Sequence, residues 1–569
     1  MKLAALTISN FGCFDQEGCT IKIDDIVVLI GKNNAGKSTV LDAYEAFASM
    51  GAKLPLSAFR EENENHPIVI EGVFVDITEE DTNTMGVACV HNDPEYGQAI
   101  RVKFQWTRAE EEGEKFTYNG TTGSFQPGGT GGWNTLLQSR IPVPLRIKPT
   151  DTPAKLEKII IDILATAIKQ KIKTGNERVQ ELIDQVKALT EEFAIEIQDE
   201  IDSACAAISD KLEDVFPNYS VQFIPDGKLE PDKILGAGSY VRLLAADNPA
   251  LPLKNQGSGL QRTFLWSAIA ALAEIGRMKQ GTKNLSPDKP RILLIDEPEA
   301  FLHPPMVRSA REALYALAEL ENWQVMASTH SSVFIDVSKA HTTIIRLERD
   351  QHFSTRVIST DSLQFNEEEK TRLAMVRSCN PMVNEFFFAD SVLLVEGETE
   401  HLVFSALLNR AGLNGKYHIV NCIGKANLPL FAKILNHFQV MYVSLHDSDS
   451  PKAQRNGNWI QNGAWTVNAN ILNTTLLSTR DSYCIAHVPD FEGYYFGEQA
   501  DRDKPFTAYK ILYSPEFATD PRYERLRDFS QHLEGNAHPQ AYQTLQELGD
   551  KLQVYVQAHQ PTPVERWQL

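Results

Sequence analysis

Acidic side chains follow two strand-like segments in the last third of the chain, and carboxylates at strand ends can hold divalent cations. One apolar run ends at Glu396, with Glu400 four residues later, and another ends near Asp447 and Asp449. Strands that alternate with helices in this region predict a parallel sheet, whose carboxyl-end loops would bring these acids together. Four carboxylates stay charged at close range only with cations among them, and oxygen ligands favour Mg²⁺ or Mn²⁺. Two such ions can activate water and stabilise the leaving oxygen of a phosphodiester.

A second chemical motif lies near the N-terminus, where G-x-x-x-x-G-K-S follows the apolar run Ile26–Ile30. Its glycines let backbone N–H groups turn around phosphate, the following helix N-terminus adds positive potential, and the lysine reaches the terminal phosphates. The motif therefore predicts a site for ATP or GTP, with a plain tight turn as the alternative. The expected nucleotide-binding residues are Gly31, Asn33, Asn34, Gly36, Lys37, Ser38 and Thr39.

Two later strand-like segments supply candidates for the rest of a nucleotide site. Asp296 ends the apolar run that begins at Arg291, and we expect it to share a magnesium ion with Ser38 of the loop. Glu297 directly after it is the expected base that orients the attacking water. His330 ends the next strand-like segment and is expected to contact the γ-phosphate.

Composition limits the classes of protein that fit. A chain of 569 residues exceeds one hydrophobic core, so several domains are expected. No apolar run could span a bilayer, no secretory signal is visible, and the seven cysteines are scattered without a C-x-x-C pair. These features favour a cytoplasmic protein without structural zinc or disulfides. The net charge of −20 weakly disfavours DNA as a partner, although a whole-chain charge does not describe a local site.

Hydrophobic periodicity supplies the elements that must position these residues. Strand-like alternation marks the first 30 residues, Ile68–Val75 and Ala99–Trp106, and a glycine-rich stretch at 113–133 predicts a flexible surface loop. From Lys155 to Phe216 apolar residues recur at helical spacing, which predicts a helical insert that either forms a dimer contact or packs in the core.

The nucleotide residues resemble those of ABC-type ATPase heads, in the subgroup with RecF-like, SMC-like and Rad50-like proteins. Asn10-Phe11 with Phe14 resembles the opening of that subgroup. The resemblance implies that Ser258 and Gly259 of one copy complete the nucleotide site of another, although they depart from the full LSGGQ form. It therefore implies a homodimer or tetramer assembled through the heads.

The acidic segment resembles a Toprim domain, and the head followed by Toprim resembles the OLD (overcoming lysogenization defect) nuclease family, including its retron- and Gabija-associated members. The implied fold class is α/β: an ABC-type P-loop ATPase head with a helical insert, then a Toprim domain with a Rossmann-like parallel sheet. The implied domains are 1–385, with the insert at about 155–216, and 386–569. The resemblance also implies Glu492 as a later metal ligand and Lys504, with Lys510 as its rival, as the lysine that stabilises the transition state.

The expected function is an ATP-binding DNA endonuclease or exonuclease that uses Mg²⁺ or Mn²⁺, is regulated by nucleotide and acts in defence against phage. Its possible partners, besides DNA, are a retron reverse transcriptase with its msDNA or a helicase subunit. The main alternative is an ATP-dependent DNA clamp or scaffold whose acidic site is degenerate. A topoisomerase or primase fits poorly, because no segment for a nucleophilic tyrosine is evident and the cysteines cannot supply a zinc module.

Overall fold

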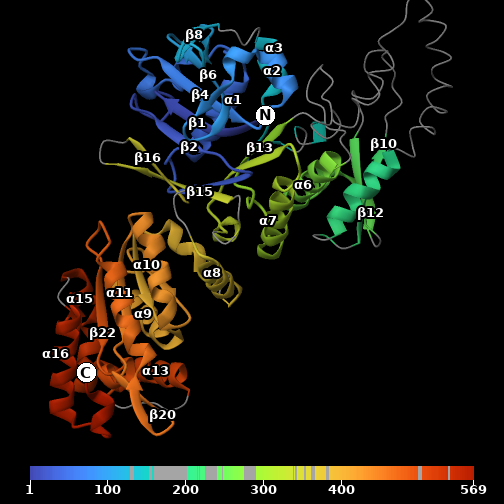
Figure 1. The fold of residues 1–569 in the computed structure, drawn as a ribbon. Helices are drawn as coiled ribbons and strands as arrows, with labels where there is room; N and C mark the ends of the chain where they lie inside the picture. Colours follow the sequence, from blue (N-terminus) through green and yellow to red (C-terminus); the bar gives the residue numbers. More distant parts are fainter. Residues whose placement is uncertain are drawn as a thin grey trace, which may run out of the picture. The chain divides into compact units, whose positions relative to one another are not determined.

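The chain divides into two compact units, Met1–Ser359 and Thr360–Leu569, in a computed structural model (Figure 1). The structure describes residues 1–128, 134–152, 155, 157–158, 201–213, 216, 218–224, 240–245, 248–274, 290–336, 339, 342–350, 354–360, 365–379, 383–497, 503–535 and 538–569. In this part of the chain no helix combines the length and the apolar character needed to cross a membrane.

A mostly parallel sheet forms the centre of the first unit. The strands in spatial order are β16 (Thr355–Ser359), β15 (Thr342–Arg349), β3 (Ile26–Gly31), β14 (Trp323–Ser328), β13 (Arg291–Asp296) and β9 (Val143–Ile147). Every residue of β3, β13 and β14 is buried, which explains their continuous apolar runs: a parallel sheet is covered on both faces. The order places β14 between β3 and β13, so the loops after these three strands meet at one edge.

An antiparallel sheet forms the other layer of this unit. Its strands are β2 (Cys19–Lys22), β1 (Lys2–Ser9), β4 (Ile68–Val75), β6 (Gly97–Trp106), β7 (Glu114–Asn119) and β8 (Ser124–Pro127), with β5 (His91–Asp93) paired to β6. Helix α1 (Lys37–Ala48) contributes to the core that both sheets share, where Phe47 meets Phe74 and Phe104 at centroid distances of 5.8 and 5.4 Å. This core fixes the start of α1, and with it the phosphate loop.

Several local predictions are confirmed and one is wrong. The strand Ile68–Val75 is observed as expected, and the strand expected at Ala99 begins two residues earlier. The prediction of a flexible loop fails for 114–127, which form the hairpin β7–β8. Its strands carry alternating aromatic side chains, and the Asn119 side chain closes the turn by accepting bonds from two backbone N–H groups. The remainder of that stretch, 129–133, lies outside the described residues.

The helical insert expected at about 155–216 lies largely outside the described residues, although 201–213 are helical. Beyond it the chain forms a small antiparallel sheet and two helices. These elements are β10 (Tyr219–Ile224), β11 (Tyr240–Ala245), β12 (Asn248–Pro252), α6 (Ser258–Glu274) and α7 (Pro304–Ala318). Helix α6 therefore begins at Ser258, one of the two residues expected to complete the nucleotide site of another copy.

The second unit is built on another sheet with parallel central strands. Its strands in spatial order are β18 (His418–Asn421), β17 (Ser391–Val395), β19 (Met441–Asp447), β22 (Tyr483–His487) and the antiparallel β23 (Ala541–Tyr542). Helices α9 (Glu398–Ala411), α13 (Lys504–Leu512) and α15 (Phe529–Gly535) share one hydrophobic core with this sheet, and α10 (Leu428–His437) and α11 (Gly463–Thr475) pack together. This is the α/β fold expected for the C-terminal part.

The compact units divide at Ser359 and Thr360, ahead of the expected boundary at 385 and 386. The helix between them, α8 (Glu367–Cys379), belongs to the second unit. Glu369 on α8 accepts a hydrogen bond from Lys433 of α10 at 2.9 Å, so this connecting helix packs on the sheet domain that follows it.

Candidate functional site

The phosphate loop between β3 and α1 requires backbone conformations that glycine adopts readily. Gly36 has a φ of 104°, and a Cβ added there would collide with the Cys13 sulfur. The buried Lys37 ammonium donates hydrogen bonds to the carbonyl oxygens of Gly31 at 2.9 Å and Lys32 at 3.0 Å. The lysine is thus turned into the loop, where a nucleotide phosphate can replace these backbone acceptors.

The other loop residues predicted to bind nucleotide lie around this lysine. Asn33 and Asn34 are exposed, and Asn34 has a left-handed φ of 62°. The hydroxyl of Thr39 accepts from the Cys13 thiol at 3.7 Å, on the first turn of α1. The loop therefore exposes the two amide side chains, while its lysine is turned towards the loop's own carbonyl oxygens.

Asp296 lies at the centre of a polar network that joins three strands and the loop. Its Oδ1 accepts hydrogen bonds from the hydroxyls of Ser38 at 3.0 Å and Ser328 at 2.6 Å. Its Oδ2 accepts from the Arg146 guanidinium at 2.6 Å. The structure thus brings together Ser38 and Asp296, the two residues expected to share a magnesium ion.

Arg146 and Ser328 were missed by the sequence reasoning, yet both carry a signal. Arg146 interrupts an otherwise apolar strand, β9, and Arg146 is buried. Ser328 ends β14 directly opposite Asp296 in the parallel register. A charged or polar residue at the end of a buried strand is a reasonable candidate for such a network.

The acidic turn after β13 also orders the loop that carries His330. Glu297 has a left-handed φ of 46°, and its N–H donates to the carbonyl of Ser328 at 2.8 Å. Glu299, another missed residue, accepts from the Thr329 hydroxyl at 2.8 Å and the His330 N–H at 2.7 Å. Burial raises the pKa of Glu299. Burial and the Lys37 charge lower the pKa of His330, which favours a neutral imidazole.

The two residues expected to serve another copy lie at the start of α6. Ser258 is exposed at the first position of that helix. A Cβ at Gly259 would come within 2.8 Å of the Phe301 carbonyl oxygen, so the turn packs closely there. Phe301 is 65% exposed and lies 5.2 Å from the Arg262 guanidinium, which leaves an aromatic surface beside Ser258.

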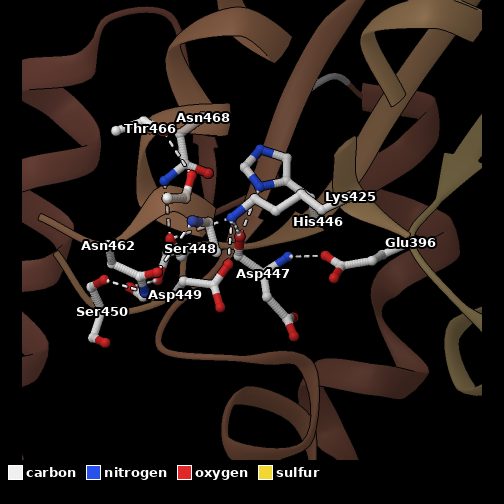
Figure 2. A network of polar contacts seen from close by, with 12 residues as sticks. Glu396, Lys425, His446, Asp447, Ser448, Asp449, Ser450, Asn462, Thr466 and Asn468 are labelled. Atoms are coloured by element: carbon white, nitrogen blue, oxygen red, sulfur yellow. Dashed lines mark hydrogen bonds and ion pairs between the residues drawn. The ribbon is translucent and has the colours of Figure 1, made fainter. Parts of the chain in front are cut away.

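In the second unit, neighbouring parallel strands bring the predicted acids to one edge of the sheet. Glu396 follows β17, Glu400 lies in the first turn of α9, and Asp447 is the last residue of β19. The Asp447 N–H donates to Glu396 Oε2 at 3.4 Å, and Figure 2 shows the Glu396 side chain directed at that backbone. The Asp447 carboxylate accepts from the Phe491 N–H at 2.7 Å.

The acids perturb one another's protonation. Burial, together with Glu396, Glu400 and Glu492, raises the pKa of Asp447 well above its usual range. Burial and the neighbouring Glu396 raise the pKa of Glu400 to about 7. Such a cluster of crowded, poorly hydrated carboxylates is stabilised by a cation, and its oxygen donors suit Mg²⁺ or Mn²⁺. The donor chemistry therefore fits a divalent ion, although the described side chains include no trio of His, Cys, Asp or Glu already at metal-binding separations.

Lys425 neutralises the second acid of the D-x-D motif. Its Nζ donates to Asp449 Oδ2 at 2.6 Å and to the Asp447 carbonyl at 2.6 Å, and the side chain is buried (Figure 2). Asp449 is therefore paired with an ammonium, whereas Asp447 remains among carboxylates. Lys425 is therefore engaged inside the acidic site.

Glu492 and Lys504 come together from two helices that follow the sheet. Lys504 Nζ donates to Glu492 Oε2 at 3.0 Å, with Glu492 buried on α12 (Phe491–Tyr495) and Lys504 at the first position of α13. The rival Lys510 is directed elsewhere, with its Nζ 4.2 Å from the Phe506 ring centroid. His487 was missed by sequence reasoning; its Nδ1 lies 3.9 Å from Asp447 Oδ1, at the end of the next strand.

Comparison with known families matches both units. The model described as AAA ATPase domain matches residues 1–124 and 148–335, which include the phosphate loop, Asp296 and His330. The model described as overcoming lysogenization defect protein-like, TOPRIM domain matches residues 387–449, which include Glu396, Glu400 and Asp447. Glu492 and Lys504 lie beyond that match.

Three relatives carry nuclease names. The Old nuclease of Escherichia phage P2 is 28% identical over 79% of this chain and 77% of its own length. The OLD nuclease of Thermus scotoductus is 23% identical over 79% of this chain and 82% of its own length. Endonuclease GajA of Bacillus cereus is 26% identical over 34% of this chain and 30% of its own length.

Proposed function

The chain belongs to the AAA ATPase domain family and also carries an OLD-like TOPRIM domain, and from this premise we propose that it is a nucleotide-binding, metal-dependent DNA endonuclease. The observation that carries the proposal is the position of Asp447 at the end of β19, where its N–H donates to Glu396 Oε2 at 3.4 Å and the charges of Glu400 and Glu492 help to raise its pKa. The nuclease names of its relatives agree with this chemistry.

The residues of the acidic site take distinct roles in this proposal. Glu396, Glu400, Asp447 and Glu492 would hold Mg²⁺ or Mn²⁺, with Asp449 as a further ligand once Lys425 releases it. The bound ion supplies Lewis-acid activation of water and charge neutralisation at a phosphodiester. Lys504, which donates a hydrogen bond to Glu492, would stabilise negative charge that develops on the phosphate.

We further propose that nucleotide binding controls cutting. Lys37 and the loop backbone would hold ATP, Ser38 and Asp296 its magnesium ion, Glu297 the attacking water, and His330 the γ-phosphate. The exposed Ser258 and the neighbouring Gly259 would complete the site of a second copy, which makes the active form a homodimer or tetramer. ATP can shift the nuclease only by the difference in its affinity for the two states. The resemblance to the OLD family extends the proposal to defence against phage, with a retron or helicase component as a possible partner.

The decisive experiment compares plasmid cleavage by the parent chain and by Asp447→Asn, with Mg²⁺ or Mn²⁺. The parent should cut, and the variant should lose at least about a hundred-fold in rate, because one metal-binding carboxylate becomes a neutral amide. Asp481→Asn, an exposed acid in the same unit, is the matched control and should cut like the parent. Equal cutting by the Asp447 variant would reject the proposed site. Rates that are identical with ATP, with ADP and without nucleotide would reject regulation alone.

One observation favours a second candidate, an ATP-dependent DNA clamp or scaffold. The ion pair between Lys425 and Asp449 leaves one acid of the D-x-D pair neutralised without a metal. A degenerate site could be stabilised in this way. Metal-dependent cleavage by the purified chain, lost in Asp447→Asn, would exclude this candidate.

A further inference from the structure

A groove of about 810 Å³ runs beside α9 in the second unit and has no role in the proposed chemistry. Its size is in the range of small-molecule and cofactor sites. The polar and aromatic side chains that line it include His401, Asn409, Asn414, His418, Tyr509 and Tyr513. They come from α9 and the turn after it, from the edge strand β18 and from the C-terminal end of α13, so the groove lies at the border of the sheet. Glu385, which precedes β17, adds a carboxylate to the lining.

The groove leads away from the acidic site. At one end, His401 directly follows Glu400, and Lys504 at the start of α13 binds Glu492. At the other end, Arg410 of α9 donates to the carbonyl of Leu512 at the end of α13, at 2.6 Å. The two helices therefore run side by side in the same direction, with Glu400 in the first turn of one and Lys504 at the start of the other.

The chemistry of the groove suits nucleobases. Tyr509 and Tyr513 are 47% and 61% exposed, and their rings lie 4.5 Å apart with an interplanar angle of 35°. The Arg410 guanidinium lies 5.4 Å from the Tyr513 ring, which adds a cation beside the aromatic surface. Nδ1 of His401 has no hydrogen-bond partner among the described residues.

Two neighbouring exposed tyrosines beside the Arg410 cation and the His401 Nδ1 atom point to a flat, polar-edged ligand. Single-stranded nucleic acid binds on such surfaces, because bases stack on aromatic rings while cations contact the backbone. A base-paired duplex keeps its bases stacked on one another and offers no free face to these rings.

We propose that this groove, which runs along α9 from His401, binds an unpaired DNA strand, with bases stacked on Tyr509 and Tyr513 and the backbone beside Arg410. This inference rests on the proposed nuclease function and deepens it by naming the substrate: DNA with a single-stranded segment, such as an overhang, flap or opened end. The His401 imidazole and the side-chain amides of Asn409 and Asn414 would contact base edges.

The test measures binding of fluorescent oligonucleotides to the full chain in EDTA, so that no cutting occurs. A single strand and a duplex with a single-stranded overhang should bind more tightly than a blunt duplex. The double variant Tyr509→Ala/Tyr513→Ala should bind the single strand roughly 10- to 100-fold more weakly, because two stacking surfaces are removed. The double variant to Phe keeps both rings and should bind like the parent.

Either of two results would overturn the proposed role of the groove. One is single-strand binding by the double Ala variant that equals binding by the parent, and the other is a loss of binding in the double Phe variant as large as in the double Ala variant. Leu477→Ala, at a 75% exposed apolar residue elsewhere in the unit, is the surface control and should leave binding unchanged. Plasmid cutting by the parent is measured separately. If the parent binds single strands through its tyrosines but never cuts, the proposed role of the groove stands and the proposed nuclease function is rejected. If the parent cuts but its binding does not depend on the tyrosines, the nuclease function stands and the role of the groove is rejected.

Discussion

Arg146 donates a 2.6 Å hydrogen bond to Asp296, and both side chains are buried at the ends of adjacent strands. Asp296 also accepts the Ser38 and Ser328 hydroxyls, so the arginine is a positive partner of the carboxylate expected to bind magnesium. The Asp296 carboxylate would then be shared between the Arg146 guanidinium and the metal ion that accompanies ATP.

Arg146→Met should therefore destabilise the nucleotide-free first unit by about 3–5 kcal/mol, because Asp296 keeps its buried charge and loses its partner. Mg²⁺ with ATP should recover a larger part of the thermal stability in the variant than in the parent. Differential scanning calorimetry with and without Mg-ATP measures both effects. An equal nucleotide-induced shift in the two proteins would show that Arg146 and the metal do not share Asp296.

Lys37→Ala should abolish most nucleotide binding, since its ammonium lies inside the loop at 2.9 Å from the Gly31 carbonyl. We expect affinity for ATP to fall by about a hundred-fold or more, as one charge-assisted contact to phosphate is lost. Lys32→Ala alters an exposed lysine of the same loop and is the control. Calorimetric titration of Mg-ATP gives the two affinities, and similar losses in both variants would contradict a specific role for Lys37.

Lys504→Met should reduce the rate of DNA cleavage by about 10²- to 10³-fold with little change in DNA affinity, because the lysine is proposed to act on charge in the transition state. Lys510→Met provides the comparison, since that ammonium faces the Phe506 ring at 4.2 Å. Single-turnover cleavage at saturating enzyme separates rate from affinity. A slower rate in the Lys510 variant, with a normal rate in the Lys504 variant, would reverse the assignment.

The second unit should lose stability in mild acid through His538. Burial, with His532 and Lys551 nearby, lowers the pKa of His538 to about 3, and its Nδ1 accepts the Gln540 N–H. An unfolded histidine has a pKa of about 6.5, so the unfolded state binds more protons below that pH. The stability that His538 contributes is therefore complete above about pH 6.5 and falls by up to about 1.4 kcal/mol per unit as the pH decreases towards 3.

His538→Gln should remove this dependence, so the melting temperature should fall less between pH 7 and pH 5 than it does in the parent. His559→Gln changes an exposed histidine on α16 (Leu545–His559) and should retain the parent's dependence. Thermal unfolding of the full chain at the two pH values provides the comparison. If the melting temperature falls equally in the parent and in His538→Gln, other groups cause the acid sensitivity.

Much of the architecture could be predicted because it depends on local pattern. Apolar runs such as Ile26–Ile30 predict buried parallel strands, and the spacing from Gly31 to Ser38 predicts the phosphate loop. The strand-helix alternation after Asp390 predicts the second sheet, and the acids at its strand ends must meet at one edge. The hairpin at 114–127 was missed because its glycines and polar turn outweigh a short aromatic alternation.

Local sequence patterns do not predict contacts between residues that are far apart in the chain. Arg146 and Asp296 are 150 positions apart, and Lys425 and Asp449 meet only because their loops follow β18 and β19 on either side of β17. The contact of Lys504 with Glu492 depends on how two helices pack after the last parallel strand.

The amino-acid sequence by itself determined which chemical groups stand at which strand ends, since periodicity and loop spacing act over a few residues. Only the tertiary structure decided which carboxylate remains among other acids and which is neutralised by a lysine. Strand order, register and helix packing place these charges, and each depends on contacts that span the whole unit.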